Sequence, residues 1–188
     1  MVANSALPSY LLTAEEIDAI MGTSHIKPTE VFGHMDATTE PTSKPLCAWL
    51  LGTARMPVYE RSGYSGVADQ AFTIDGLSVW AGQTAVAFPT ADQAHTFFSS
   101  SADTWKGCAG KTVTVNRADG TERWSFGEAT QGDSQIAQVA TLEAGAGYAC
   151  QHVLRLVSNA VIETTACNDH ITDEASRIAE KIVARVTG

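Results

Sequence analysis

The chain has few basic residues and no long apolar run. Lys and Arg number 12 against 21 Asp and Glu, which gives its 188 residues a formal charge of −9. So few cations cannot form a broad phosphate-binding surface, so we expect neither nucleic acid nor an anionic lipid surface as a partner. No segment approaches the ~20 apolar residues that a membrane-spanning helix needs. The first ten residues also lack the basic region and apolar core of a signal peptide, so the chain is either cytosolic or a piece of an exported protein without its targeting segment.

Motifs for catalysis and metal binding are missing as well. The five histidines form neither HxH nor HExxH, and the four cysteines include no CxxC pair, so no metal site is expected. Gly63 to Gly66 is not a nucleophile elbow, because Val67 stands where that motif needs its second glycine. A Cys150 nucleophile beside His152 is conceivable, but a disulfide at Cys150 would remove the thiol. We therefore predict no catalytic residue and no cofactor, with a secreted hydrolase as a remote alternative.

The composition is that of a globular protein. Apolar residues make up 44% and charged residues 18% of the chain. A domain of this length buries roughly 70% of the surface of its unfolded chain, so it does not need cysteines to fold. We expect residues 1–10 to be an N-terminal extension or an expression remnant, and residues 11–188 to form a single domain.

Three helices are indicated by their capping residues. Thr13 and Glu16 form a capping box that predicts a helix over residues 14–21, ended by Gly22. Thr90 caps a second helix that ends near residue 107. The apolar face of this second helix is expected to hold Ala94, Phe97, Phe98, Ser101 and Trp105. Acidic residues at 173 and 174 open a third helix near the C-terminus.

Several segments are predicted to be strands. They are residues 47–59, residues 71–74 and 77–80 around an Asp75-Gly76 turn, residues 83–88, and residues 134–142 with a possible bulge. Residues 111–117 and 121–127 alternate around Asp119-Gly120, which predicts a hairpin. That turn would pair Val115 with Trp124, Val113 with Phe126 and Arg117 with Glu122. These patterns predict an α+β fold with a twisted, mostly antiparallel sheet of about six or seven strands and helices packed against it.

The spacing of two cysteines predicts a disulfide. Residues 148–157 and 160–167 form a second hairpin that turns at Ser158-Asn159. Counting outward from this turn places Cys150 directly opposite Cys167, in a non-hydrogen-bonded pair, where side chains approach most closely. The alternative is two buried free thiols. Spacing does not decide whether Cys47 and Cys108 also pair.

Four residues are candidates for ligand contact from their type and predicted strand placement. They are Tyr64, Trp80, Trp124 and Arg155. The plainer interpretation places the tryptophans in the core and Arg155 on an exposed strand face.

Scattered motifs along the chain give it a family resemblance. They are Trp105-x-x-Cys108-Ala109-Gly110-Lys111-Thr112-Val113 after an Ala/Phe-rich helix, Tyr148 before Cys150, Asn159-x-Val161 before Ala166-Cys167, and Ile178-Ala179-x-Lys181-Ile182-Val183, together with Leu11-Leu12 and Ile20-Met21-Gly22. From residue 11 to residue 186 the chain resembles the PknH-like extracellular domain family, which comprises sensor domains of mycobacterial receptor Ser/Thr kinases and related lipoproteins. The resemblance implies a central cleft and two disulfides, Cys47–Cys108 and Cys150–Cys167. It supplies no catalytic residues.

The resemblance also implies a function and a location. It implies a non-enzymatic, extracytoplasmic sensor domain of the mycobacterial cell envelope, tethered to the membrane by a segment absent from this chain. Its partner would be an unidentified small-molecule, lipid, glycan or peptide ligand. The alternative is an envelope lipoprotein or protein-interaction module. The sequence does not distinguish a receptor kinase from a lipoprotein as the full-length protein, and it does not indicate the oligomeric state.

Overall fold

The computed structural model describes residues 1–74 and 78–188, and it contains helices at both ends and in the middle of the chain. The α-helices are α1 (Leu7–Tyr10), α2 (Ala14–Met21), α3 (Pro45–Ala48), α4 (Met56–Tyr59), α5 (Ala91–Cys108) and α6 (Glu174–Thr187), and the 3₁₀ helices are η1 (Asn4–Ala6) and η2 (Trp49–Leu51). The predicted capping box is present at α2, which ends at Gly22 with φ +68°. Thr90 caps α5 by accepting a hydrogen bond from the backbone N–H of Gln93. The sequence therefore places all three of the longer helices correctly.

The strands form one antiparallel sheet. They are β1 (Lys27–Pro28), β2 (Gly66–Thr73), β3 (Trp80–Ala87), β4 (Thr112–Arg117), β5 (Gly120–Phe126), β6 (Thr130–Gln131), β7 (Gln135–Leu142), β8 (Ala149–Val157) and β9 (Ala160–Asn168). The order across the sheet is β1-β2-β3-β9-β8-β7-β5-β4, with β6 paired to β7 off this path. This confirms the α+β class. The described residues form nine strands, more than the six or seven predicted, and two of these strands contain only two residues each.

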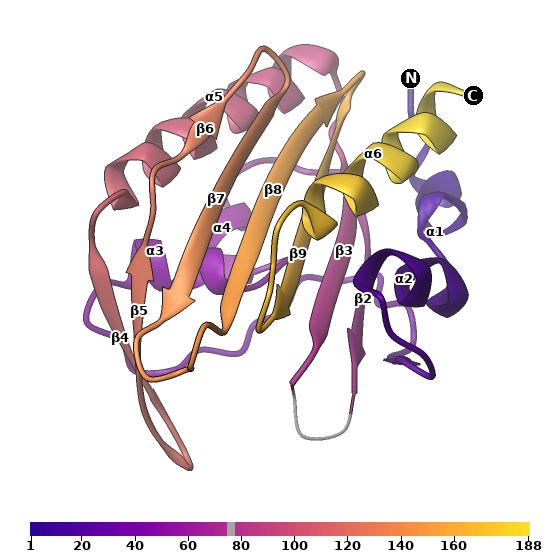
Figure 1. The fold of residues 1–188 in the computed structure, drawn as a ribbon. Helices are drawn as coiled ribbons and strands as arrows, with labels where there is room; N and C mark the ends of the chain where they lie inside the picture. The colour runs from indigo at the N-terminus through magenta and orange to yellow at the C-terminus, as the bar shows by residue number, and fades with distance from the viewer. Residues whose placement is uncertain (75–77) are drawn as a thin grey trace.

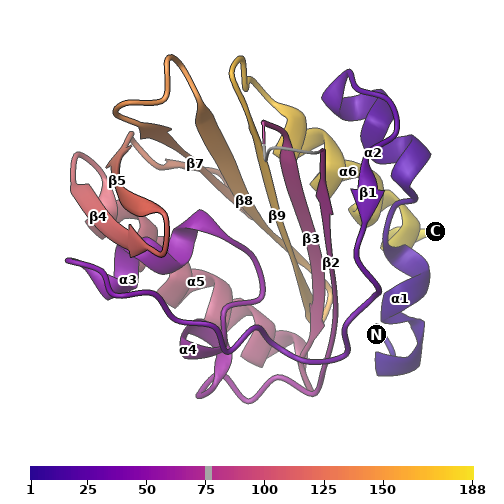
Figure 2. The same cartoon turned by 90° about the horizontal axis from the view of Figure 1, so that it is seen from below.

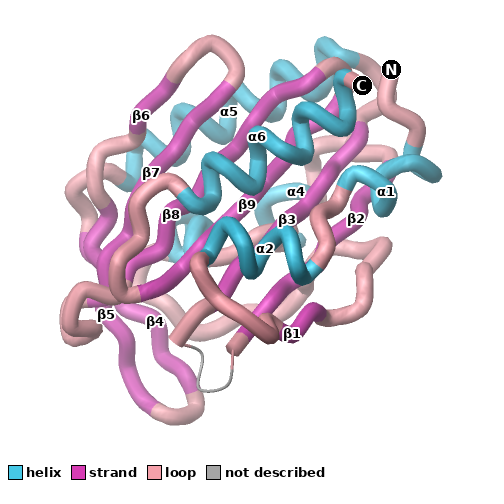
Figure 3. Tube along the Cα trace, turned by 45° about the vertical axis from the view of Figure 1, so that its right-hand side comes forward, coloured by secondary structure: helices cyan, strands magenta, loops and turns pink. Residues whose placement is uncertain are grey.

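Helices cover both faces of the sheet (Figures 1 and 2). Helices α3, α4 and α5 lie on one face, and α1, α2 and α6 lie on the other (Figure 3). Because successive side chains of a strand point to opposite faces, each strand contributes to two cores. In β8, Cys150 and Leu154 belong to the core under α5, whereas Val153 and Val157 belong to the core under α6.

The first ten residues, expected to lie outside the domain, pack onto it. Val2 and Leu7 are buried in the core that includes α6. The Val2 N–H donates a hydrogen bond of 2.6 Å to Asn159 Oδ1, and Asn159 Nδ2 donates one of 3.2 Å to the Val2 carbonyl. Asn159 lies in the β8–β9 turn, so these hydrogen bonds hold the N-terminal segment against one end of the central hairpin.

The predicted strand over residues 47–59 is wrong, because this segment forms α3, η2 and α4. Pro45 and Pro57 lie in the first turns of α3 and α4, where the missing N–H of proline costs no helical hydrogen bond. Cys47, Leu50 and Tyr59 are buried from these three short helices. The continuous apolar run is therefore a set of helical turns that pack on the sheet.

The β4–β5 hairpin is present, but its predicted register is wrong by two residues. The Cα partners are Val113 with Trp124, Val115 with Glu122 and Arg117 with Gly120. Gly120 has φ +152°, a conformation that side-chain-bearing residues rarely adopt, so glycine follows the turn instead of lying inside it. A shift of two residues keeps every side chain on its predicted face. Arg117 still reaches Glu122, with Nε 2.8 Å from Oε2.

Two other strand predictions change. The Asp75-Gly76 turn lies outside the described residues. Strand β3 runs without a break from Trp80 to Ala87, so it includes five residues of the predicted strand 83–88 but only Trp80 of the predicted strand 77–80. Strand β7 pairs with β8 without interruption from Gln135 to Thr141, so the described sheet has no bulge there.

Both disulfides are present, with the pairing that the family resemblance implies. Cys150 and Cys167 face each other across β8 and β9, as the count from the turn predicts. Cys47 and Cys108 lie 61 residues apart in sequence, and their disulfide joins α3 to the last residue of α5.

Candidate ligand-binding cleft

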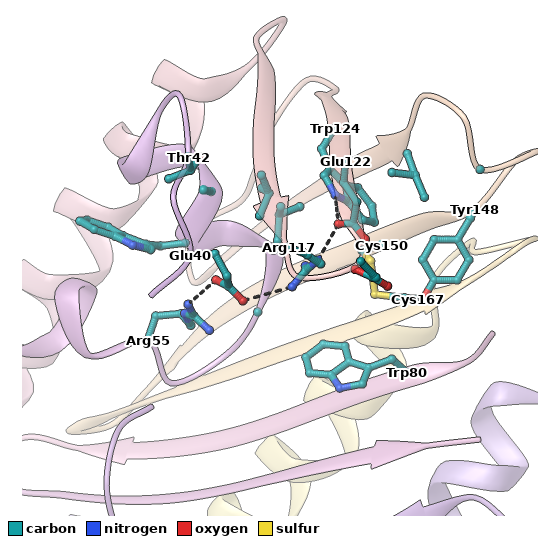
Figure 4. Close-up of a pocket in the computed structure, with 18 of the residues that line it drawn as sticks. Glu40, Thr42, Arg55, Trp80, Arg117, Glu122, Trp124, Tyr148, Cys150 and Cys167 are labelled. Atoms are coloured by element: carbon teal, nitrogen blue, oxygen red, sulfur yellow. Dashed lines mark hydrogen bonds and ion pairs between the residues drawn. A yellow bond between two sulfur atoms is a disulfide. The ribbon is translucent and has the colours of Figure 1, made fainter. Parts of the chain in front are cut away.

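A cleft of about 590 Å³ opens on the face of the sheet that carries α3 and α5. Its walls come from four regions: the loops around α3 and η2, the β4–β5 hairpin, the connection from β7 to β8, and one end of strands β3, β8 and β9 (Figure 4). A volume of this size suits a drug-sized or cofactor-sized molecule. The cleft implied by the family resemblance is therefore present.

Aromatic rings line much of this cleft. They belong to Trp49, Trp80, Trp124 and Tyr148. Trp124 and Tyr148 meet edge to face, with ring centroids 6.2 Å apart. Trp80 is the Cα partner of Cys167, so its ring and that of Tyr148 lie at the disulfide end of the cleft (Figure 4). Trp49, Trp80 and Tyr148 are partly exposed and give a ligand apolar contact area in fixed positions, whereas Trp124 is 4% exposed and packs in the core behind them.

A chain of ion pairs runs along the opposite wall (Figure 4). Arg55 Nη1 is 2.7 Å from Asp36 Oδ2, and its Nη2 is 3.3 Å from Glu40 Oε2. Arg117 Nη1 lies 3.1 Å from Glu40 Oε1, and Arg117 Nε lies 2.8 Å from Glu122 Oε2. Burial lowers the pKa of Arg117, but the carboxylates of Glu122 and Glu40 outweigh this effect and raise it. The five charges connect two loops to the β4–β5 hairpin.

The segment between η2 and α4 lies on the sheet beside the cleft. A Cβ atom on Gly82 of β3 would lie 2.8 Å from Thr53 Oγ1 and 2.8 Å from the Trp80 ring, so only glycine allows this close approach. Ala54 adopts φ +53°, and its N–H donates a hydrogen bond of 3.0 Å to Glu163 Oε2. A glycine on β3 and a buried carboxylate on β9 thus position this segment.

Glu163 is the centre of a buried polar network behind the cleft. Its Oε1 lies 2.9 Å from His152 Nε2, and its Oε2 also accepts a hydrogen bond of 2.8 Å from the Tyr59 hydroxyl. The His152 ring stacks on Trp105, with centroids 4.3 Å apart. Burial, followed by the charge of Glu163, raises the pKa of Tyr59 well above its ordinary value, so this hydroxyl stays protonated and donates.

A second cavity of about 280 Å³ adjoins the cleft and shares Gly52, Arg55 and Trp80 with it. Asp69 lines this cavity and accepts hydrogen bonds from Thr53 Oγ1 at 3.2 Å and Thr84 Oγ1 at 2.5 Å. Burial raises the pKa of Asp69 from 3.8 to about 6, although both hydroxyls act in the opposite direction. Asp69 therefore takes up a proton at a pH where an unfolded chain would still keep this carboxylate ionised.

This pKa predicts a pH-dependent effect of Asp69→Asn. A carboxyl group with a raised folded-state pKa binds more protons in the folded chain, so its contribution to stability grows as pH falls from about 7 to about 4. At pH 7.5 the ionised Asp69 costs up to about 3 kcal/mol, which the uncharged variant should recover. Urea unfolding between pH 4 and pH 7.5 measures this, with exposed Asp133→Asn as the control. A difference between Asp69→Asn and wild type that does not change with pH would contradict it.

Two of the four candidate ligand-contact residues line the cleft, and Tyr64 does not. Trp80 contributes from the first residue of β3 and Trp124 from β5. Tyr64 instead packs edge-on against Tyr59, with ring centroids 6.3 Å apart.

Arg155 faces away from the cleft. Cys150 lines the cleft, and the alternation along β8 turns the odd-numbered Arg155 toward the α6 face. There its Nη1 donates a hydrogen bond of 2.9 Å to Gln135 Oε1. Because side chains alternate along a strand, the sequence alone places Cys150 and Arg155 on opposite faces of β8. Once Cys150 is assigned to the cleft, Arg155 is therefore excluded from it.

Sequence reasoning missed most of the polar wall. Glu40 and Arg55 lie in loops, for which no strand or helix period predicts a neighbour. Arg117 and Glu122 carried a usable signal, because the predicted hairpin already placed them as a charged pair. In the described part of the chain, no group of three His, Cys, Asp or Glu residues could hold a metal ion.

Comparison with known proteins identifies the family. The family model described as "PknH-like extracellular domain" matches residues 2–185. The chain belongs to this family. Among curated relatives, the serine/threonine-protein kinases PknH of Mycobacterium bovis and Mycobacterium tuberculosis are each 38% identical over 187 residues, which is 98% of this chain. The chain spans 31% and 30% of the lengths of these two PknH kinases.

The fold also matches a solved member of the family. The crystal structure of the extracellular domain of PknH from Mycobacterium tuberculosis superposes with a TM-score of 0.94 at 38% identity, covering 99% of this chain and 97% of that one. The PknH-like family model begins at residue 2, in agreement with the packing of the first ten residues. Within the described residues of this family member, no helix is long and apolar enough to cross a membrane.

Proposed function

We propose that this chain is the ligand-binding sensor domain of a mycobacterial receptor Ser/Thr kinase, and that it binds its ligand in the cleft without catalysing a reaction. The observation that carries this proposal is the cleft of about 590 Å³, whose aromatic walls are built from segments far apart in sequence. The matched relatives are kinases several times longer than this chain. An exported location, tethered to the membrane by another segment, follows from the same relationship.

The arrangement of the walls suggests how a ligand would be sensed. One wall consists of strand ends within the central sheet, while the other consists of loops and a hairpin joined by ion pairs. A ligand that contacts both walls would change the position of the β4–β5 hairpin, at the edge of the sheet, relative to β3, β8 and β9 in its centre. This change is the conformational signal that we propose for the receptor.

The second candidate is an envelope lipoprotein that uses the same domain to bind another protein. A protein-binding surface usually shows a contiguous apolar patch. In the described part of the chain, the exposed large apolar side chains are Met1, Val31 and Leu46, which come from three separate segments. The cleft is therefore the better-supported binding site.

A thermal-shift screen of the domain against lipids, glycans, peptides and amines tests the proposal. A ligand at about 100 times its Kd should stabilise the domain by about 2.7 kcal/mol, which is roughly 5–10 °C in Tm. Trp80→Ala should abolish the shift, and Trp49→Ala is a second cleft variant in case the first fails to fold. Arg155→Ala, on the other face of the sheet, should retain it. No shift with any class, or shifts unaffected by the cleft variants, would refute the proposal.

A further inference from the structure

We infer that the ligand of the cleft is an organic cation: a protonated amine or quaternary ammonium group carried on an apolar or ring-shaped body. This inference rests on the proposed function and names the ligand class for the same site. Its basis is the balance of charge in the cleft together with the aromatic rings that surround it.

The two cationic side chains of the cleft are already paired with carboxylates. Arg55 contacts Asp36 and Glu40, and it also donates a hydrogen bond of 2.6 Å to the Thr38 carbonyl. Arg117 is held by Glu40 and by Glu122. An anionic ligand would have to displace these carboxylates, leaving them unpaired within the cleft at a large cost. The wall therefore disfavours a phosphate or carboxylate ligand.

Negative charge in the cleft exceeds what these arginines neutralise. Four carboxylates line the cleft, from Glu40, Asp119, Glu122 and Asp169. The cationic residues in the same lining are Arg55 and Arg117. Glu40 and Glu122 are the carboxylates of the ion-pair chain, whereas Asp119 and Asp169 form no ion pair with any described residue. Two carboxylates are therefore available to a cation in the cleft. The chain as a whole, at −9, would also attract cations.

The negative charge reaches the aromatic end of the cleft. Tyr148 has its pKa raised to about 12, first by burial and then by the charges of Glu122 and Asp169. The same ring meets Trp124 edge to face, and Trp80 lies nearby in the same lining. Aromatic faces next to carboxylates attract ammonium groups through the ring quadrupole, and they provide no comparable attraction for anions.

The size of the cleft indicates how large the ligand is beyond its charged group. About 590 Å³ is far more than a simple ammonium ion fills, so the charged group must belong to a larger body that contacts the remaining rings. The adjoining cavity of about 280 Å³ is lined by Asp69 and by Asp36, the second of which pairs with Arg55 in the same lining. A longer ligand with a second amino group could extend into it past Arg55.

Three probes of matched shape and different charge test the ligand class. They are benzylamine, benzyl alcohol and benzoate, titrated into the ¹⁵N-labelled domain and followed by amide chemical shifts. We expect benzylamine to bind at least about tenfold more tightly than the other two, with shifts at residues of the cleft and with an affinity that falls as salt is added. Equal affinities, tighter binding of benzoate, or no binding of benzylamine would overturn the inference.

Charge-removing variants identify the carboxylates involved. Asp169→Asn and Asp119→Asn should each weaken benzylamine binding about three- to tenfold while leaving benzyl alcohol unchanged. Asp133→Asn removes the same charge from an exposed position outside the cleft and should have no effect. If Asp119→Asn and Asp169→Asn bind benzylamine as tightly as wild type, the inference is wrong.

The two proposals fail in different ways. Suppose that benzylamine does not bind but a compound of another class binds in a Trp80-dependent manner. This result refutes the inference of a cationic ligand and supports the proposal of a ligand-binding sensor domain. Failure of every compound to bind refutes both.

Discussion

Replacing Glu163 with alanine is expected to destabilise the domain by about 3–5 kcal/mol, because its buried carboxylate is the partner of three other buried groups. The carboxylate is buried and accepts hydrogen bonds from the Ala54 N–H and the Tyr59 hydroxyl, and it contacts His152. Truncation leaves all three groups inside the protein without their partner, and each unsatisfied buried group costs about 1–3 kcal/mol. Urea unfolding at pH 7 measures the loss.

Glu163→Gln separates the hydrogen bonds from the charge. The glutamine amide can still accept hydrogen bonds from the Ala54 N–H and the Tyr59 hydroxyl, and its NH₂ group remains beside His152 Nε2, so this variant should lose less than half as much stability. Exposed Glu60→Ala is the control for removing a glutamate and should change stability by less than about 0.5 kcal/mol. Equal losses for the alanine and glutamine variants would show that the charge itself, rather than the network, supports the fold.

The second large effect is expected from the Cys47–Cys108 disulfide. The double substitution Cys47→Ala and Cys108→Ala removes this disulfide. It thereby opens the loop between two cysteines that lie 61 residues apart in sequence. The chain-entropy treatment gives a loss of about 4 kcal/mol, equivalent to roughly 8–16 °C in Tm. The loss should also loosen α3 against the end of α5, and so one wall of the cleft. Differential scanning calorimetry measures the stability, and binding of a cleft ligand reports on the wall.

The Cys150–Cys167 disulfide provides the matched comparison. Its sequence separation is 17 residues, so the same treatment gives about 3 kcal/mol for the double alanine variant. The two cysteines also lie within a regular hairpin that pairs every residue of β8 from Ala149 to Val157, so we expect this ladder to remain without the bridge. A larger loss from this pair than from Cys47 and Cys108 would mean that chain entropy does not determine their relative contributions.

The sequence predicts the strand register correctly where a regular ladder and a tight turn occur together. The Ser158-Asn159 turn placed Cys150 opposite Cys167 because every pair in β8 and β9 follows from that one position. The same reasoning misplaced the β4–β5 register, since Gly120 follows its turn instead of lying within it. One glycine can serve either position, and the sequence does not distinguish the two.

Most of the residues that line the cleft could not be predicted from the sequence. Trp80 and Trp124 were named from residue type, and the sheet places both on the cleft face. Glu40 and Arg55 belong to irregular segments whose positions depend on packing over Gly82 and on the buried carboxylate of Glu163. Contacts of this kind join residues 15 to 109 positions apart, and no periodicity in the sequence encodes them.

The attachment of Val2 to the β8–β9 turn places the N-terminus and the cleft at opposite ends of the central hairpin. The cleft is lined by Cys150 and Cys167, near the start of β8 and the end of β9, whereas Val2 is bound to Asn159 at the opposite end of the same hairpin. Nine residues of β8 separate the two ends, a distance of roughly 30 Å. The N-terminal segment is therefore held at the end of the central hairpin remote from the cleft, so a restraint on this segment would leave the cleft accessible.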